Sequence, residues 1–209
     1  MFRGPIVLLA ALFLVTACGG TSPYAIQSEI DAGNFEGAAE KLAKRRDAYP
    51  DDFDTRLNLA DVYYQLARES LDAKNQTAYV DYLAKAQAEV LEAVRIDPTS
   101  PRPHTWLGII TAYQGDLDSS ETSFKNALRL NLAERMELRA GTYYSNIAHI
   151  SVYQGKLGDA RRYLDKGVKN GAPQDEIDRI SVLAAWKAND MVEARDVFNS
   201  AIVLSPAFG

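Results

Sequence analysis

Three residues carry the side chains that enzymes and metal sites use most often: a single Cys at position 18 and two His at positions 104 and 149. One Cys excludes an intrachain disulfide, a thiolate zinc cluster and a Cys-x-x-Cys redox pair. His149 lies near Ser145 and Ser151, but the sequence has no Gly-x-Ser-x-Gly nucleophile turn. His104 follows a Pro-rich start and is better explained by packing at the beginning of a helix. We therefore predict no catalytic residue and no enzyme activity.

Carboxylates cluster at two places, residues 51–54 and 175–178, both next to predicted helix starts, where the helix dipole favours negative charge. Three aspartates in the first cluster could hold a cation, but it lacks the Gly and the closing Glu of a calcium loop. No Gly-rich phosphate loop is present, so we expect no metal and no cofactor. The formal net charge of -5, without a basic run, provides no electrostatic surface for nucleic acid or anionic lipid.

The N-terminal segment has the features of a signal peptide. Arg3 is followed by the uniformly apolar run Ile6–Val15. Ten residues rising about 1.5 Å each reach only half of a ~30 Å hydrocarbon layer, so the run is too short for a membrane span. The stretch Val15-Thr16-Ala17-Cys18 resembles the lipobox of bacterial lipoproteins, whose Cys is acylated and becomes the first residue of the mature chain. An ordinary secretory signal with a chance Cys is the alternative.

The lipoprotein resemblance implies an anchor of several acyl chains on Cys18, and two or more chains give stable membrane attachment. Gly19, in place of Asp, implies outer-membrane location with the protein facing the periplasm, and membrane contact through the lipid alone. We divide the chain into a signal peptide (1–17), a flexible tether (18–23), a repeat domain (24–206) and a tail (207–209). Removing residues 1–17 takes away one Arg and no acid, which changes the net charge from -5 to -6.

From Tyr24 onward, apolar residues recur at spacings of three and four, which predicts helices. Pro and Gly between these runs divide them into short segments. A turn residue is followed five positions later by a small residue, nine later by a large apolar residue and seventeen later by a helix end. The four instances are Gly33-Ala38-Leu42-Pro50, Gly115-Ser120-Phe124-Leu132, Gly155-Ala160-Leu164-Ala172 and Asn189-Ala194-Phe198-Pro206. A fifth instance, Asp81-Ala86-Val90-Pro98, keeps the spacing but starts inside a helical run.

This pattern resembles the tetratricopeptide repeat, a helix-turn-helix unit of 34 residues. The third unit matches best, with His104 in the position of the consensus Trp, followed by Leu107-Gly108 and by Phe124. The resemblance implies an all-α solenoid of about five units, in which stacking buries the apolar faces and creates a concave groove.

The second unit, from Arg56 to Pro98, is fourteen residues longer than a repeat allows. Its extra residues, within Leu66–Lys85, keep a helical apolar spacing, so we expect both helices to overrun by about two turns, or roughly 10 Å. A disordered loop is the alternative. Six more residues around Glu134–Ala140 are expected to lengthen the start of a helix.

The predicted array ends at Ala207-Phe208-Gly209 without a polar capping helix. The helix around Val197–Leu204 would then expose an apolar edge. Partner docking, self-association and a self-capped end are all open.

In the tetratricopeptide family, ligands bind along the first helix of each unit. Carried to this chain, the resemblance implies a groove lined by Asp61, Tyr64, Ile109, Tyr113, His149, Tyr153, Arg179 and Trp186. A column of aromatic residues with a few charges suits an extended or helical peptide. Each of these aromatic residues could instead belong to the core.

We therefore expect a lipid-anchored adaptor that binds a protein or peptide partner for an envelope machine, with a type IV or Tad pilus or a secretion system as the first choice. Alternatives are outer-membrane-protein assembly, regulation of peptidoglycan hydrolases, and a small-ligand binder that partners a transporter's solute-binding protein. The small-ligand binder predicts an enclosed apolar cavity, whereas the adaptor predicts an open groove.

Overall fold

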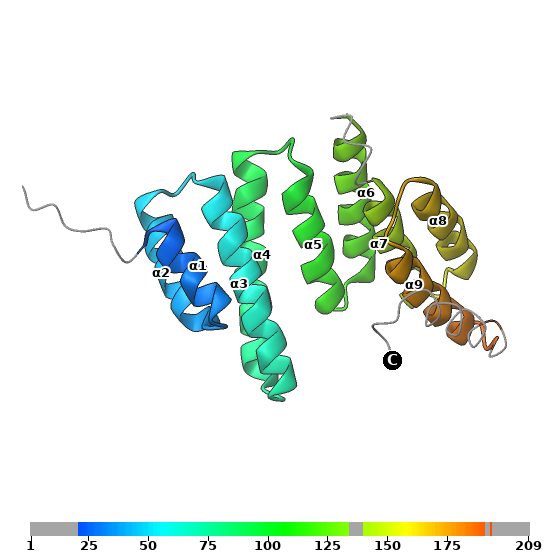
Figure 1. The fold of residues 1–209 in the computed structure, drawn as a ribbon, viewed down its shortest axis with the longest axis horizontal. Coiled ribbons are helices and arrows are strands. Elements are labelled where there is room, and N and C mark those ends of the chain that lie inside the picture. Colours follow the sequence, from blue (N-terminus) through cyan, green and yellow to red (C-terminus); the bar gives the residue numbers. More distant parts are fainter. Residues whose placement is uncertain (1–20, 134–139, 191–192, 194–209) are drawn as a thin grey trace, which may run out of the picture.

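The computed structural model describes residues 21–133, 140–190 and 193, which form nine α-helices and no strand (Figure 1). The predicted all-α solenoid is confirmed. The helices are α1 (Pro23–Asp31), α2 (Phe35–Ala48), α3 (Phe53–Asp72), α4 (Gln76–Ile96), α5 (Pro101–Tyr113), α6 (Leu117–Ala133), α7 (Ala140–Tyr153), α8 (Leu157–Lys169) and α9 (Gln174–Lys187). Predictions on Cys18 and the signal peptide, on the insertion at 134–139, and on Val197–Leu204 and the tail lie outside the described residues.

Helix boundaries follow from capping side chains and left-handed turns. Ser22, Asn34, Asp52, Asn75 and Ser100 each accept a backbone N–H at the start of the following helix, as N-cap residues do. The four turn residues predicted from the repeat spacing, Gly33, Gly115, Gly155 and Asn189, all have a positive φ. This left-handed conformation ends one helix and lets the next fold back against it.

The first helix begins slightly earlier than the predicted domain boundary. Pro23, which we assigned to the tether, is the first residue of α1, and the Ser22 side chain caps it. The reason is local: Pro is favoured in the first turn of a helix because its fixed φ suits the helix and its missing N–H is not needed there.

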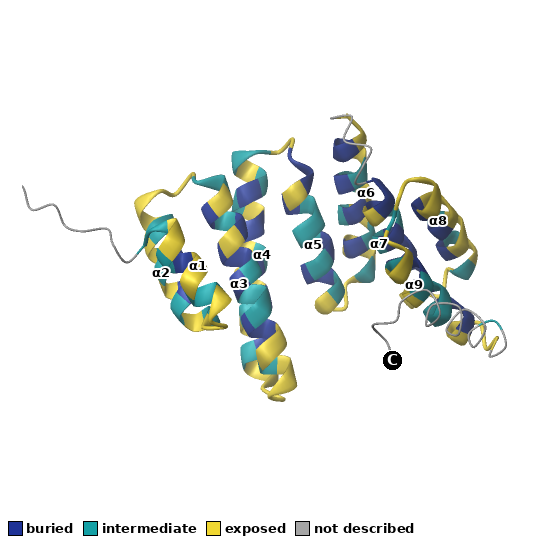
Figure 2. Ribbon diagram, viewed as in Figure 1, coloured by how far each residue is buried: buried dark blue, intermediate teal, exposed yellow. Residues whose placement is uncertain are grey.

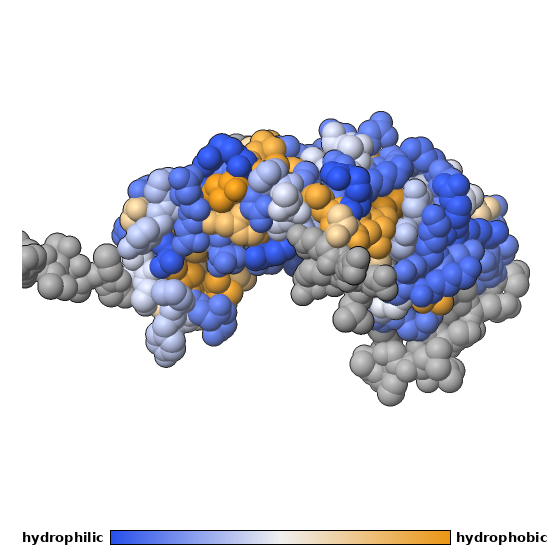
Figure 3. Space-filling view, turned by 90° about the horizontal axis from the view of Figure 1, so that it is seen from above, coloured by the Kyte–Doolittle hydropathy of each residue, from blue (hydrophilic) through white to orange (hydrophobic). Residues whose placement is uncertain are grey.

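Successive helices pack as antiparallel pairs, and the pairs stack side by side into a row (Figure 1). Buried residues lie along the faces where the helices meet, and exposed residues cover the outer sides (Figure 2). Small residues allow the close approach within a pair, since Ala38, Ser120 and Ala160 are fully buried. Seen from above, the row of helices is curved like an arch (Figure 3). Its concave side is the side that faces the viewer in Figure 1, where α1 and α3 lie in front.

The pair α3 and α4 is longer than the others, as predicted. Its helices have 20 and 21 residues, compared with 13 in α5 and 14 in α7. The three-residue turn Ala73–Asn75 joins them directly, so the extra residues are helical and the alternative of a disordered loop is wrong. The end of this pair projects beyond its neighbours (Figure 1).

A buried ion-pair cluster joins the first two units. Glu89 in α4, 6% exposed, accepts hydrogen bonds from Arg46 in α2 at 2.7 Å and from Arg56 in α3 at 2.6 Å. Arg56 is in the position of the consensus Trp, so an ionic contact takes the place of aromatic packing there. Because two guanidinium groups surround the carboxylate, its charge is compensated where water cannot reach it.

Candidate functional site

Three aromatic side chains from α3 and α5 form what we call the aromatic wall: Tyr64, Trp106 and Tyr113. The Tyr64 ring meets Trp106 edge-on, with ring centroids 5.7 Å apart, and meets Tyr113 at 5.1 Å and nearly at right angles. Such edge-to-face contacts fix ring orientations. Tyr113 is 41% exposed, while Tyr64 and Trp106 are half-buried, so the wall presents preordered aromatic surface to solvent.

Side chains from the extended parts of α3 and α4 contact the aromatic wall. The Tyr79 hydroxyl, in the extended part of α4, donates a hydrogen bond of 2.6 Å to the backbone carbonyl of Tyr113. Arg68, in the extended part of α3, holds its guanidinium 6.0 Å from the Tyr64 ring. Burial, followed by a hydrogen bond with Tyr113, raises the pKa of Tyr64 well above its ordinary value. The Tyr64 hydroxyl is therefore neutral at physiological pH and can donate or accept hydrogen bonds.

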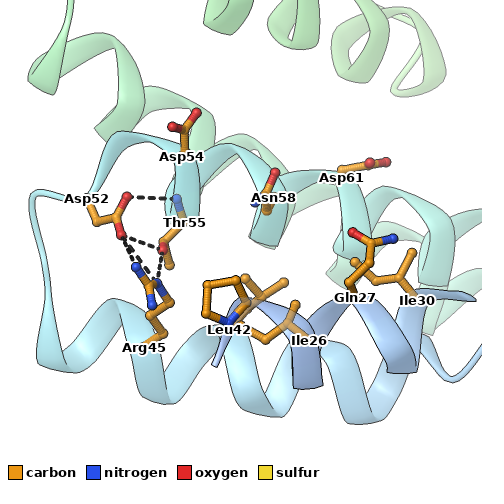
Figure 4. A pocket seen from close by; sticks show the side chains of 11 residues that line it. Ile26, Gln27, Ile30, Leu42, Arg45, Asp52, Asp54, Thr55, Asn58 and Asp61 are labelled. Carbon is orange, nitrogen blue, oxygen red and sulfur yellow. Dashed lines mark hydrogen bonds and ion pairs between the residues drawn. The ribbon is translucent and has the colours of Figure 1, made fainter. Parts of the chain in front are cut away.

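A pocket of about 460 Å³ lies between α1, α2 and α3 (Figure 4). Asp61, which lines it, comes three residues before Tyr64 of the aromatic wall, or about one helical turn. Ile26, Ile30 and Leu42 form its apolar side, and the amides of Gln27 and Asn58 lie at its exposed rim. Its remaining lining residues are Pro23, Arg45, Asp52, Asp54, Thr55 and Asp61. We call it the α1–α3 pocket.

The charges of the α1–α3 pocket sum to a negative value, because three carboxylates face one guanidinium. Arg45 and Asp52 pair at 3.0 Å, and Asp52 also accepts hydrogen bonds from Thr55 (Figure 4). Burial would raise the pKa of Asp52, but the hydrogen bonds from Thr55 and Arg45 outweigh it and hold that pKa below its ordinary value. The cluster at Asp52 is therefore internally neutralised.

The predicted groove residues of the other end lie on α7 and α9. The rings of His149 and Tyr153 are 5.0 Å apart, and Tyr153 is 50% exposed. Burial, and then the nearby charge of Arg179, lower the pKa of His149, so its imidazole is neutral at pH 7. Trp186 is 57% exposed at the end of α9.

The serines near His149 are not arranged as nucleophiles. Ser145 donates its hydroxyl hydrogen bond to the carbonyl of Thr142, and Ser151 donates to the carbonyl of Ile147. Both hydroxyls thus bond to their own helix. Among the described residues, no group of three or more His, Cys, Asp or Glu side chains is placed to hold a metal ion.

Among the predicted groove residues, Tyr64 contacts Tyr113, and His149 contacts Tyr153. Asp61 lies about one turn before Tyr64 on α3, and the charge of Arg179 on α9 lies near His149 on α7. Ile109 is half-buried and packs against the cluster around Phe124.

Sequence reasoning missed Trp106 and the pocket side chains on α1. Trp106 lies three residues before Ile109 and seven before Tyr113, and this helical spacing would have placed it on the same face. The contribution of α1 had no such signal, because its residues match the repeat pattern poorly.

The chain belongs to the tetratricopeptide repeat family. The family's profile matches residues 25–75 and 145–207. The residues between these ranges include α4, which pairs with α3, and the pair α5–α6. That pair is the third unit, whose residues fit the consensus pattern best. No curated protein sequence matches the chain.

Solved structures share the fold at low sequence identity. They include TTC0263, a tetratricopeptide repeat protein of Thermus thermophilus (20% identity, TM-score 0.59, covering 86% of this chain and 79% of that one). MamA aligns with 18% identity and a TM-score of 0.63, over 88% and 91% of the two chains. PilW, described as a widely conserved type IV pilus biogenesis factor, aligns with 16% identity and a TM-score of 0.69, over 89% and 76%.

None of the described helices is both long enough and apolar enough to cross a membrane. Tetratricopeptide repeats act as protein-interaction scaffolds, and the preordered aromatic surface of this chain suits that role.

Proposed function

We propose that this protein is a lipid-anchored adaptor, held by Cys18 to the periplasmic face of the outer membrane, that binds a segment of a partner protein across the aromatic wall. The single observation that carries the proposal is the partly exposed, mutually fixed set of Tyr64, Trp106 and Tyr113 beside an open pocket. Aromatic side chains supply large contact area and lose little conformational entropy on binding.

The properties of the α1–α3 pocket favour an adaptor over a small-ligand binder. Its lining mixes charged and apolar groups, and Gln27 and Asn58 at its rim are exposed. A dedicated small-molecule site is typically an enclosed, mainly apolar cavity. We therefore place a protein segment, and not a small solute, on this surface.

We propose assembly of an envelope machine, a type IV or Tad pilus or a secretion system, as the process served. The likeness to PilW, a type IV pilus biogenesis factor, extends over most of both chains and supports this choice at the level of the fold. Capture of the partner from native membranes would identify the machine.

Substitution of the wall tests partner binding. We expect Trp106→Ala to weaken capture of cross-linked envelope proteins from native membranes by roughly 30-fold, because a central aromatic contact contributes about 2 kcal/mol or more. Tyr49→Ala is the matched control, since Tyr49 is an exposed aromatic residue away from the wall. Equal recovery of the same partners by both variants, with folding verified by circular dichroism, would overturn the proposal.

Substitution of Cys18 tests the anchor separately. Cys18→Ser removes the acylated side chain, so we expect the protein to lose incorporation of labelled palmitate and to leave the outer-membrane fraction. A variant that remains in the outer membrane would contradict lipid anchoring, whatever the result for the wall.

A further inference from the structure

The α1–α3 pocket and the aromatic wall share one helix. Asp61, which lines the pocket, and Tyr64, which belongs to the wall, are three residues apart on α3 and so lie on neighbouring positions of one face. A peptide that lies on the wall and continues along α3 towards the start of that helix therefore reaches the pocket.

Two of the three carboxylates of the pocket already have cationic partners. Asp52 pairs with Arg45, and Asp54 pairs with Arg102 of α5 at 2.8 Å. Among the described residues, the Asp61 carboxylate accepts a side-chain hydrogen bond only from the amide of Gln65, at 3.1 Å. No Lys or Arg of the described residues lies within ion-pair distance of Asp61. Within the part of the chain that the structure describes, the pocket thus keeps one half-buried carboxylate without a countercharge.

The other residues that line the pocket suit a long side chain that ends in a cation. Ile26 and Ile30 provide apolar surface on one side, and the amide oxygens of Gln27 and Asn58 provide further acceptors near Asp61 (Figure 4). Lys and Arg have this combination, an aliphatic stem and a charged end. A partner side chain that ends in a carboxylate would repel Asp61, and a fully apolar partner side chain would leave the Asp61 carboxylate unpaired.

We propose that the α1–α3 pocket is a specificity subsite for a Lys or Arg side chain of the partner segment whose other residues lie on the aromatic wall. The inference rests on the proposed function, because it assumes that a peptide segment occupies the wall. The stem packs on Ile26 and Ile30, and the cation bonds to the Asp61 carboxylate. The subsite makes the partner class concrete: a segment with a basic residue next to aromatic or apolar ones.

The test is selection from a display library of random peptides by the full-length protein, purified in mild detergent. We expect the wild type to enrich peptides with a Lys or Arg at a constant distance from apolar residues. Asp61→Asn should lose the basic preference and keep the apolar one. Asp72→Asn is the matched control, because it removes the same charge from an exposed position on the same helix.

The strength of the contact is measured with one selected Arg peptide and its citrulline analogue, which keeps the shape and removes the charge. We expect the analogue to bind the wild type roughly 10-fold more weakly, as for the loss of one charge-assisted hydrogen bond. For Asp61→Asn the difference should fall below about two-fold, which a double-mutant cycle measures as coupling. Shifts of the side-chain amide signals of Gln27 and Asn58 on peptide addition would place the cation in the pocket.

The outcomes separate the two proposals. If the wild type selects peptides without a basic residue, or if Asp61→Asn keeps the basic preference, the subsite is wrong, whereas binding of peptides to the wall stands. If the wild type selects no peptide, or if selection is indifferent to Trp106→Ala, the proposed function fails and the subsite fails with it.

Discussion

Ion pairs between charged side chains connect successive helix pairs. Glu121 in α6 accepts hydrogen bonds from Lys125 on its own helix and from Lys156, which immediately precedes α8. The bond from Lys125 lowers the pKa of Glu121 most, burial opposes it and Lys156 adds to the lowering, so that the pKa is about 2 instead of 4.5. The ionised carboxylate therefore stabilises the folded protein more than the unfolded chain.

We expect Glu121→Gln to lower the free energy of unfolding at neutral pH by about 1–2 kcal/mol, since the partner lysines are half exposed and solvent screens them. Because the folded pKa is the lower one, the stabilisation is full above the unfolded pKa of 4.5 and is lost as the pH falls towards about 2. Urea unfolding across this range measures the difference, which should shrink with acidity. Glu69→Gln, at an exposed position of α3, is the control. A difference that stays constant down to the acid limit would contradict the assignment.

Within elements, the closeness of paired helices depends on small residues at defined positions. In the pair α5–α6, a Cβ added at Gly108 would lie 2.8 Å from the Phe124 ring, and the Ser120 hydroxyl donates to the Gly108 carbonyl at 2.7 Å. In the pair α3–α4, the turn residue Lys74 is followed five positions later by Tyr79, and the small residue of the repeat spacing, Ala86, comes seven positions after Tyr79 and is fully buried. Tyr79 fits since it lies in the extension, where its hydroxyl reaches the end of α5.

Gly108→Ala should destabilise the protein by about 1–3 kcal/mol, because the Phe124 ring has to move in a closely packed site. Gly158→Ala in α8 is the matched control: apart from the adjacent backbone of its own helix, no described atom lies within 4 Å of the added Cβ, so the better helix propensity of Ala should stabilise by up to about 1 kcal/mol. Thermal unfolding of the two variants measures both effects. Equal shifts in the same direction would show that packing at Gly108 does not limit the approach of the two helices.

For the whole molecule, the core is divided into clusters that each join neighbouring units. One cluster joins α1, α2 and α3, a second joins α3, α4 and α5, and a third joins α7, α8 and α9. Contacts between distant units are few, which is the arrangement expected of a repeat array. Stability should therefore vary along the row.

Ile180, fully buried in the cluster of α7, α8 and α9, tests this division. Ile180→Ala should cost about 2–5 kcal/mol locally, through lost apolar burial and the cavity left behind. We expect amide hydrogen exchange to accelerate in α7, α8 and α9 while α1 to α4 keep their protection, because the loss of stability affects only neighbouring units. Uniform acceleration over all described helices would instead indicate one cooperative unit.

Much of this architecture was predictable from the sequence, because helices, turns and repeats depend on local patterns. The apolar spacing predicted the helix pairs, Gly and Asn at fixed positions predicted the turns, which are left-handed in the structure, and the helical pattern of Leu66–Lys85 predicted the overlong pair. The resemblance to the tetratricopeptide repeat implied Asp61, Tyr64 and Tyr113 as groove residues.

Only the tertiary structure decided which of these residues meet. Trp106 contacts Tyr64, Ile109 packs against the cluster around Phe124, and α1, with a weak repeat signal, closes a pocket that Asp61 lines. These contacts depend on the stacking of one unit on the next, which sets the relative positions of side chains far apart along the chain. The sequence alone therefore determined the class of protein and its repeating elements, and stacking determined the surface on which a partner is proposed to bind.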